Sequence, residues 1–256
     1  MNALRLPLSF SLLILMLTGC DWFRTDPPVE PLPGEVHVNF ELEWEGVSYA
    51  LEQVVSDHNG YPIRLDNLQL YIAPIAFRKD GEWVETTDVS LVDFSIHAPK
   101  ELTSIPSGSY DAIRFGMGLP PEINTDIDPA SYPNSHPLSV IGSAGMFWTW
   151  ASGYIFVKYE GKFALEQGTP LLEPVSYHCG TDASYRTVTL ELPSALVVEP
   201  EGEYNATLTL DAAKALHGTN DAIDLAVDPV THNAQGDSLG GRMMDLLVDG
   251  WKIRVE

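Results

Sequence analysis

Residues 35–44 read EVHVNFELEW, and this stretch decides the fold class. Apolar residues stand at every second position, and polar residues fill the positions between them. Alternate side chains of a β-strand point to opposite faces, so the pattern predicts a strand with one buried side and one solvent-facing side. The expected buried side consists of Val36, Val38, Phe40, Leu42 and Trp44.

Similar alternation, or an apolar run bounded by turn residues, recurs along the chain. Further strands are expected at residues 65–77, 82–84, 89–94, 110–117, 154–159, 187–192 and 205–210. Pro74 predicts that its strand is an edge strand or contains a bulge, because proline cannot donate a ladder hydrogen bond. Many short strands separated by turns predict an all-β fold, a single antiparallel β-sandwich with long loops.

Helical signal is scarce: residues 211–216 are expected to form a short helical turn ended by Gly218, and a longer helical pattern follows near the C-terminus. Leu239, Met243 and Leu247 recur at helical intervals, with Ser238 as a candidate N-cap and Gly250 as a stop, which predicts a short C-terminal helix. The irregular stretch from 119 to 145 is long for a loop inside a compact domain, and loops of that length are usually functional or disordered.

Composition excludes several classes of protein. The 256 residues contain 36 Asp and Glu against 14 Lys and Arg, giving a formal net charge of −22. Such acidity argues against nucleic-acid binding, which relies on clustered basic residues. Two cysteines cannot build a disulfide-rich scaffold. A single apolar run, at the N-terminus, excludes a polytopic membrane protein.

The N-terminus has the features of a secretion signal. Arg5 precedes an apolar stretch that ends in Leu17-Thr18-Gly19-Cys20, which resembles the bacterial lipobox. We therefore expect residues 1–19 to be a lipoprotein signal peptide, Cys20 to be lipidated, and the proline-rich residues 20–34 to be a tether. This places the protein in the bacterial cell envelope, lipid-anchored to the bilayer and facing the periplasm. Asp21 resembles an inner-membrane retention signal, and the outer membrane is the alternative.

The second cysteine and the histidines are candidates for chemistry. With Cys20 lipidated, Cys179 has no intramolecular partner, and we expect it to be buried or to bind a metal. Among seven histidines, His178 in Tyr177-His178-Cys179-Gly180 has the opposite strand parity to Tyr177 and Cys179. His136 lies in the long loop. No H-E-x-x-H, Walker A or G-x-G-x-x-G motif is present, and we do not expect an enzyme.

Several ordered segments resemble the MbnP-like family of copper-binding periplasmic and surface proteins. The main one, residues 145–154, reads GMFWTWASGY and leads into Tyr159-Glu160-Gly161. The other matching segments are residues 65–72, 91–94, 108–120 and 177–180. The resemblance covers most of the chain from Cys20 onward, and it makes residues 35–256 an MbnP-like β-sandwich domain.

The resemblance implies one bound copper ion. In the family a Trp is oxidised to kynurenine, in one system by a di-haem cytochrome c peroxidase-like partner. Opening the indole releases an amine that can join imidazoles around copper, whereas an intact indole N–H only donates. The resemblance implies His178, Trp148 and Trp150 as ligand candidates, and also His136, which lies in a loop where the family often has a His, although the spacing differs. His37, on the polar face of the first strand, is a further candidate. So is Cys179, which stands where the family more often has a small or aliphatic residue. His232 also lies in a family-like position ahead of the helix, with no assigned role.

The sequence thus supports two hypotheses. The first is an envelope-anchored copper-binding lipoprotein for copper acquisition, storage or delivery, with a Trp-derived kynurenine ligand. The second is a metal-free β-sandwich module of the envelope that binds a partner, with Trp148 and Trp150 packed as core residues. Neither hypothesis involves nucleic acid, and neither involves catalytic turnover.

Overall fold

The structure, a computed structural model, describes residues 32–96, 100–124, 128–149, 153–233 and 238–256. The predictions for the signal peptide, for Cys20 and for Trp150 lie outside the described residues. Within those ranges, no helix has the length and apolar character needed to cross a membrane.

Strands dominate the described part of the chain. In order they are β1 (Pro33–Trp44), β2 (Val47–Ser48), β3 (Val54–Ser56), β4 (Pro62–Lys79), β5 (Glu82–Thr87), β6 (Ser90–Asp93), β7 (Lys100–Pro106), β8 (Gly108–Met117), β9 (Phe147–Thr149), β10 (Gly153–Phe163), β11 (Glu173–Gly180), β12 (Arg186–Val198), β13 (Glu203–Asp211), β14 (Val230–Asn233) and β15 (Trp251–Val255). The helices are α1 (Pro121–Asn124) and α2 (Ser238–Val248), with 3-10 turns η1 (Pro129–Ser131), η2 (Asp182–Ser184) and η3 (Ala212–Ala215).

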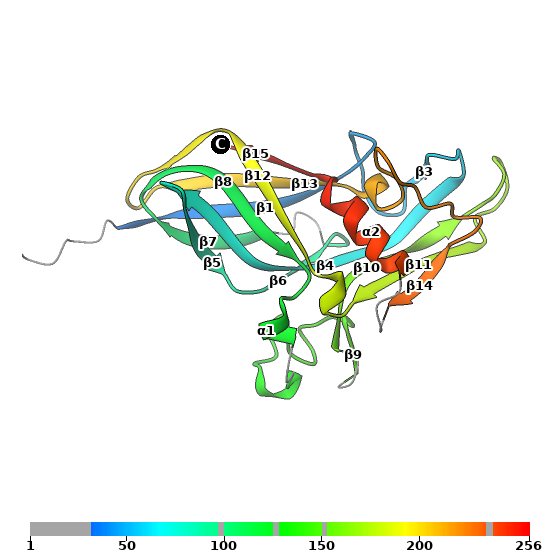
Figure 1. Cartoon of the computed structure of the whole chain (residues 1–256), viewed down its shortest axis with the longest axis horizontal. Helices are drawn as coiled ribbons and strands as arrows, with labels where there is room; N and C mark the ends of the chain where they lie inside the picture. Colours follow the sequence, from blue (N-terminus) through cyan, green and yellow to red (C-terminus); the bar gives the residue numbers. More distant parts are fainter. Residues whose placement is uncertain (1–31, 97–99, 125–127, 150–152, 234–237) are drawn as a thin grey trace, which may run out of the picture. The chain divides into compact units, whose positions relative to one another are not determined.

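The strands form two sheets, seen in Figure 1. One has five strands in the order β15-β13-β1-β2, with β7 also paired to β1. The other has ten strands in the order β12-β8-β4-β10-β11-β14, with β3, β5 and β6 attached to β4, and β9 attached to β10. The predicted all-β sandwich and its short C-terminal helix are confirmed. Two neighbouring pairs, β1–β13 and β11–β14, run parallel within otherwise antiparallel sheets.

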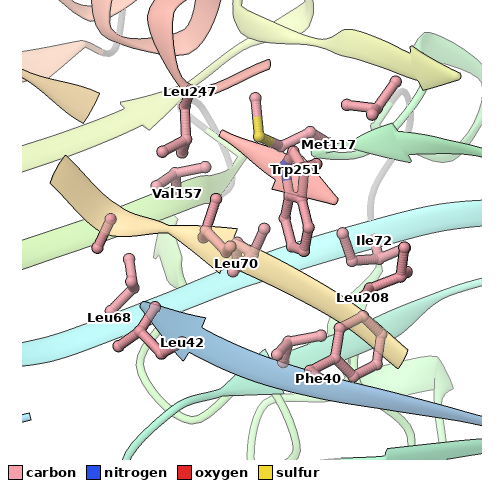
Figure 2. Close-up of a cluster of buried hydrophobic side chains, with 14 of the residues drawn as sticks. Phe40, Leu42, Leu68, Leu70, Ile72, Met117, Val157, Leu208, Leu247 and Trp251 are labelled. Atoms are coloured by element: carbon pink, nitrogen blue, oxygen red, sulfur yellow. The ribbon is translucent and has the colours of Figure 1, made fainter. Parts of the chain in front are cut away.

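The main core lies between the two sheets. The predicted apolar positions of β1 are all buried, from Val36 at 0% exposed to Leu42 at 8%. Figure 2 shows Phe40 and Leu42 from β1 together with Leu208 from β13 and Leu70 from β4. The alternation read from the sequence therefore sets which face of each sheet turns inward.

Pro74 lies in the middle of β4 and not at a sheet edge. The pairing of β4 with β8 shifts register between Ile72 and Ile75, so the strand bulges where the proline lacks an N–H. Of the two predicted alternatives for Pro74, the structure has the bulge. The Ala73–Pro74 peptide bond is cis.

A second, smaller core covers part of the outer face of the ten-stranded sheet. It contains Tyr71 of β4, Tyr154 and Phe156 of β10, and Leu138 and Met146 of the long loop. Figure 1 draws this loop, with α1 and η1, beneath β4 and β10. Thus the loop predicted to be irregular is fastened to the sheet by buried apolar contacts.

The C-terminal segment covers one part of the main core. Met243, Met244 and Leu247 of α2 are fully buried. Beyond Gly250 the chain returns as β15, a strand that the sequence analysis did not predict, which pairs with β13. Its Trp251 packs edge-on against Phe115 at a ring-centroid distance of 5.0 Å.

Replacing Phe40 by Ala tests the inward face of β1. The side chain is 3% exposed, so its removal should lower the free energy of unfolding by about 3–5 kcal/mol. Glu41→Ala is the matched control on the outward face. Its exposed ion pair with Arg254 contributes little, so the change should stay within about 0.5 kcal/mol. Denaturant unfolding measures both, and equal losses would contradict the assigned faces.

Candidate metal centre

Three neighbouring strands carry polar side chains on the outer face of the ten-stranded sheet. Tyr177 and Cys179 of β11 are buried in the main core, so the alternation turns His178 to the opposite face. The register pairs His178 with Lys158 of β10 on one side and with His232 of β14 on the other. The three residues therefore form a row across β10, β11 and β14.

The two histidines of this row are in contact. The ring centroids of His178 and His232 lie 4.7 Å apart, with the rings edge to face at 82°. Directly paired residues of neighbouring strands hold their Cβ atoms close, which brings two imidazoles together without a loop. His178 is half-buried, and its side chain is 13% exposed. His232 is exposed.

Glu160 holds the imidazole of His178. It lies two residues beyond Lys158 on the same face of β10, and its Oε1 is 2.7 Å from Nε2 of His178. The other carboxylate oxygen accepts a hydrogen bond of 3.1 Å from the side-chain amide of Asn67 on β4. The carboxylate is thus fixed from one side by β4 and faces His178 on the other.

These contacts set the charge states. Burial lowers the pKa of His178, although the hydrogen bond and charge of Glu160 act to raise it. For Glu160, burial acts to raise the pKa, but hydrogen bonds from His178 and Asn67 leave the pKa lowered. An ionised carboxylate only accepts, so the shared proton sits on Nε2 of His178. The lone pair of the neutral imidazole is then on Nδ1, the form in which histidine binds metals.

Trp148 of β9 packs against the second core and lies near His178 on the outer face of the ten-stranded sheet. Their ring centroids lie 6.3 Å apart at 51°. Gly180, two residues beyond His178, makes room for the indole: a Cβ there would lie 3.0 Å from Cζ3 of Trp148 and 2.6 Å from the Tyr154 carbonyl oxygen. The aromatic-His-x-Gly spacing therefore has a physical reason, because His178 and Gly180 share one face and only glycine admits the tryptophan.

His136 lies in the long loop, stacked on Tyr132 at 4.3 Å. Its Nδ1 accepts a hydrogen bond of 3.1 Å from the backbone N–H of Leu138. The hydroxyl of Tyr154 donates to the carbonyl of Leu138, which fastens this segment to the second core. No described contact joins His136 to His178, so its predicted ligand role stays a prediction.

Two further predicted ligands lie elsewhere. His37 is on the outward face of β1, in the five-stranded sheet, paired with Asn205 of β13. Cys179 is fully buried in the main core, with its Sγ 3.8 Å from the Met243 sulfur. Of the two alternatives for this cysteine the structure has burial, and its thiol lies across the sheet from the His178 imidazole. Neither residue is brought to the His178–His232 pair.

The row supplies two nitrogen donors of the kind that copper, zinc and nickel accept. Across the described ranges, no three or more His, Cys, Asp or Glu side chains converge well enough to hold a metal ion. The aromatic group beside the two imidazoles is Trp148.

Glu160 and His232 were not assigned as site residues from the sequence. Glu160 could have been found by parity, since it alternates with Val157 and Tyr159 on the face that His178 uses. His232 gave no such signal, because its position depends on the parallel pairing of β14 with β11. That pairing joins segments that are distant in the sequence.

Comparison with models of known protein families identifies one family. The sequence profile described as MbnP matches residues 33–234, well over half of the chain. A solved structure, MbnP from Methylosinus trichosporium, superposes with a TM-score of 0.50 at 16% identity, covering 74% of this chain and 79% of that one. At this identity the structural likeness supports the fold alone. No curated protein sequence matches the chain.

Glu160→Gln tests the coupling between this carboxylate and His178. Because the Glu160 charge acts to raise the His178 pKa, its removal should lower that pKa further. An NMR titration of the imidazole in metal-free protein measures the change. The control is Glu173→Gln, at the exposed start of β11, the strand that carries His178. This change should leave the His178 pKa unaltered. A rise in the His178 pKa in Glu160→Gln would contradict the described contact.

Proposed function

The chain belongs to the MbnP family, and on that premise we propose that it binds copper in the bacterial cell envelope, for acquisition, storage or delivery of the metal. The observation that supports this most directly is the His178–His232 imidazole pair beside Trp148. Imidazoles on neighbouring strands are ligands that suit both oxidation states of copper.

In this proposal His178 and His232 hold the ion, and Glu160 is a positioning residue. Glu160 keeps a proton on Nε2 of His178, which directs the Nδ1 lone pair outward. Bound copper would supply a one-electron redox couple. The lack of a third His, Cys, Asp or Glu donor in the described residues supports a further nitrogen from a modified tryptophan, Trp148 or Trp150.

In the conversion of tryptophan to kynurenine, oxidation breaks the indole C2–C3 bond and adds two oxygen atoms. Hydrolysis of the resulting N-formyl group then releases C2 as formate, so the net change is a gain of one oxygen atom and a loss of one carbon atom. The oxidation requires an external oxidant, which we propose a di-haem cytochrome c peroxidase-like partner to deliver. Trp148 suits such a reaction because its ring is only partly buried. We further propose that acylated Cys20 anchors the protein to the membrane, facing the periplasm, with Asp21 favouring the inner membrane.

A metal-free binding module is the second candidate, and one feature favours it. A groove of about 840 Å³ lies over the outer face of the five-stranded sheet, lined by residues that include Asn39, Glu41, Thr207 and Arg254. These donors and acceptors would suit a polar partner. If this is the function, copper binding and tryptophan oxidation should both be absent.

Replacing His178 or His232 by Ala tests the copper proposal. Loss of an outer-shell partner already weakens metal binding by about 10- to 100-fold, so loss of a ligand should exceed about 100-fold. Copper affinity is measured by competition with a chelator. His37→Ala, in the other sheet, is the matched control and should bind like the parent. Unchanged affinity in His178→Ala would contradict the proposal.

Mass spectrometry of protein extracted from its native envelope tests the two covalent proposals together. We expect acyl chains on Cys20 as the first residue, and a kynurenine mass shift on the peptide that holds Trp148 and Trp150. Fragment ions assign the shift to one of the two. Unmodified tryptophans in a copper-loaded sample would rule out the kynurenine ligand, and an unacylated N-terminus would rule out the anchor.

A further inference from the structure

A small pocket of about 180 Å³ opens over β4, β8 and β12 of the ten-stranded sheet. Phe115 of β8 is buried in the main core, so the alternation turns its neighbours Arg114 and Gly116 to the outer face. Cavities of about 150 Å³ hold a molecule the size of benzene, so the volume suits a small ligand. The lining includes Pro74, Glu85, Arg114, Gly116, Tyr185 and Thr187.

Gly116 gives this pocket its floor. A Cβ at this position would lie 2.1 Å from the Ala73 carbonyl oxygen and 2.1 Å from the hydroxyl oxygen of Tyr185. That hydroxyl donates to the same Ala73 carbonyl at 3.1 Å. Glycine therefore allows the tyrosine to lie across β8 and bond to β4, which fixes one wall of the pocket.

An aromatic ring holds the guanidinium of Arg114. Its Cζ lies 4.4 Å from the ring centroid of Trp83 on β5, within the range of a cation–π contact. Arg78 of β4 lies over the same indole at 5.7 Å. Stacking uses the face of a planar guanidinium, and the N–H donors in its plane stay available for other partners.

The two arginines differ in what their donors meet. Arg78 donates to Asp111 at 2.7 Å and to Glu191 at 2.6 Å. For Arg114 the nearest described carboxylate oxygen is Oε1 of Glu85 at 4.0 Å, which is too long for a hydrogen bond. Among the described residues its guanidinium has no hydrogen-bond acceptor. Although the chain contains 36 Asp and Glu, the donor fork of Arg114 is left for a ligand.

We propose that this pocket binds a carboxylate, either of a small organic acid or presented by another protein. A carboxylate matches the guanidinium fork with two parallel N–H···O bonds. The Thr187 hydroxyl can donate to the same group, and the rings of Pro74 and Tyr185 offer apolar surface to the carbon skeleton of the ligand. Glu85 is close enough to weaken the attraction of Arg114 for a second anion, but it does not fill the fork.

The pocket is separate from the proposed copper site. Its residues come from β4, β5, β8 and β12 and from Tyr185, which lies between η2 and β12. His178, His232 and Trp148 are not among them. Carboxylate binding at Arg114 therefore does not depend on copper binding at the histidine pair.

Titration of the protein with benzoate tests the proposal, followed by NMR of the Arg114 Nε–H and the Trp83 indole N–H. We expect saturable binding with a Kd of about 1 mM or tighter. Benzamide has the same shape without the charge, and should bind at least about tenfold more weakly. A short peptide with blocked ends and one Glu distinguishes the two sources. Binding of the peptide as well supports a carboxylate presented by a protein, and binding of benzoate alone supports a small acid.

Variants assign the binding to Arg114. Arg114→Gln should weaken benzoate binding by at least about tenfold, and Glu85→Gln should tighten it by about two- to fivefold. Arg64→Gln, also on β4 and ion-paired with Asp66, is the control and should bind like the parent. The Arg114 side chain is 35% exposed, so its variant should keep the fold, which melting temperatures check.

Two results would overturn the proposal. One is an absence of saturable benzoate binding up to about 10 mM, well above the expected Kd. The other is benzoate affinity that is unchanged in a folded Arg114→Gln variant. Loss of copper binding in His178→Ala bears only on the function proposed for the histidine pair, so failures of the two proposals are distinguishable.

Discussion

Burial of Tyr177 and Cys179 is the constraint on which the outer face of the ten-stranded sheet depends. Both side chains are fully buried in the main core, so the register of β11 cannot slip by one residue without exposing them. The same alternation sends His178 and Gly180 to the other face. The position of the imidazole is therefore fixed by core packing, and Glu160 only orients the ring.

The second core determines where Trp148 lies. Tyr71, Tyr154 and Phe156 turn one end of the outer face into an apolar platform, on which the long loop packs. β9 pairs with β10 at this end, and Phe147 contacts Tyr154 at a ring-centroid distance of 5.1 Å. Trp148 thereby stands where the apolar platform meets the polar row. An aromatic ring and two imidazoles meet there because the outer face of β10 is apolar at Tyr154 and Phe156 and polar at Lys158 and Glu160.

Much of this arrangement could be predicted from the sequence, but only where the information is local. Alternation in residues 35–44 predicted β1 and its buried face, and the parity of Tyr177-His178-Cys179-Gly180 set His178 apart from Tyr177 and Cys179. Pairing between distant segments left no local pattern. The parallel β14 that brings His232 beside His178, and the β15 strand after Gly250, both depend on such pairing. Likewise, nothing local separates His37 from His178, although they lie in different sheets.

The place of β14 in the sheet has a kinetic consequence. It ends the strand order of the ten-stranded sheet, and it spans only Val230–Asn233. Short edge strands open locally at a small fraction of the global unfolding free energy. Fraying of β14 would draw His232 away from His178 while both cores stay packed. Separation of the two imidazoles thus needs only local opening of one sheet edge, and global unfolding of the domain is not required for it.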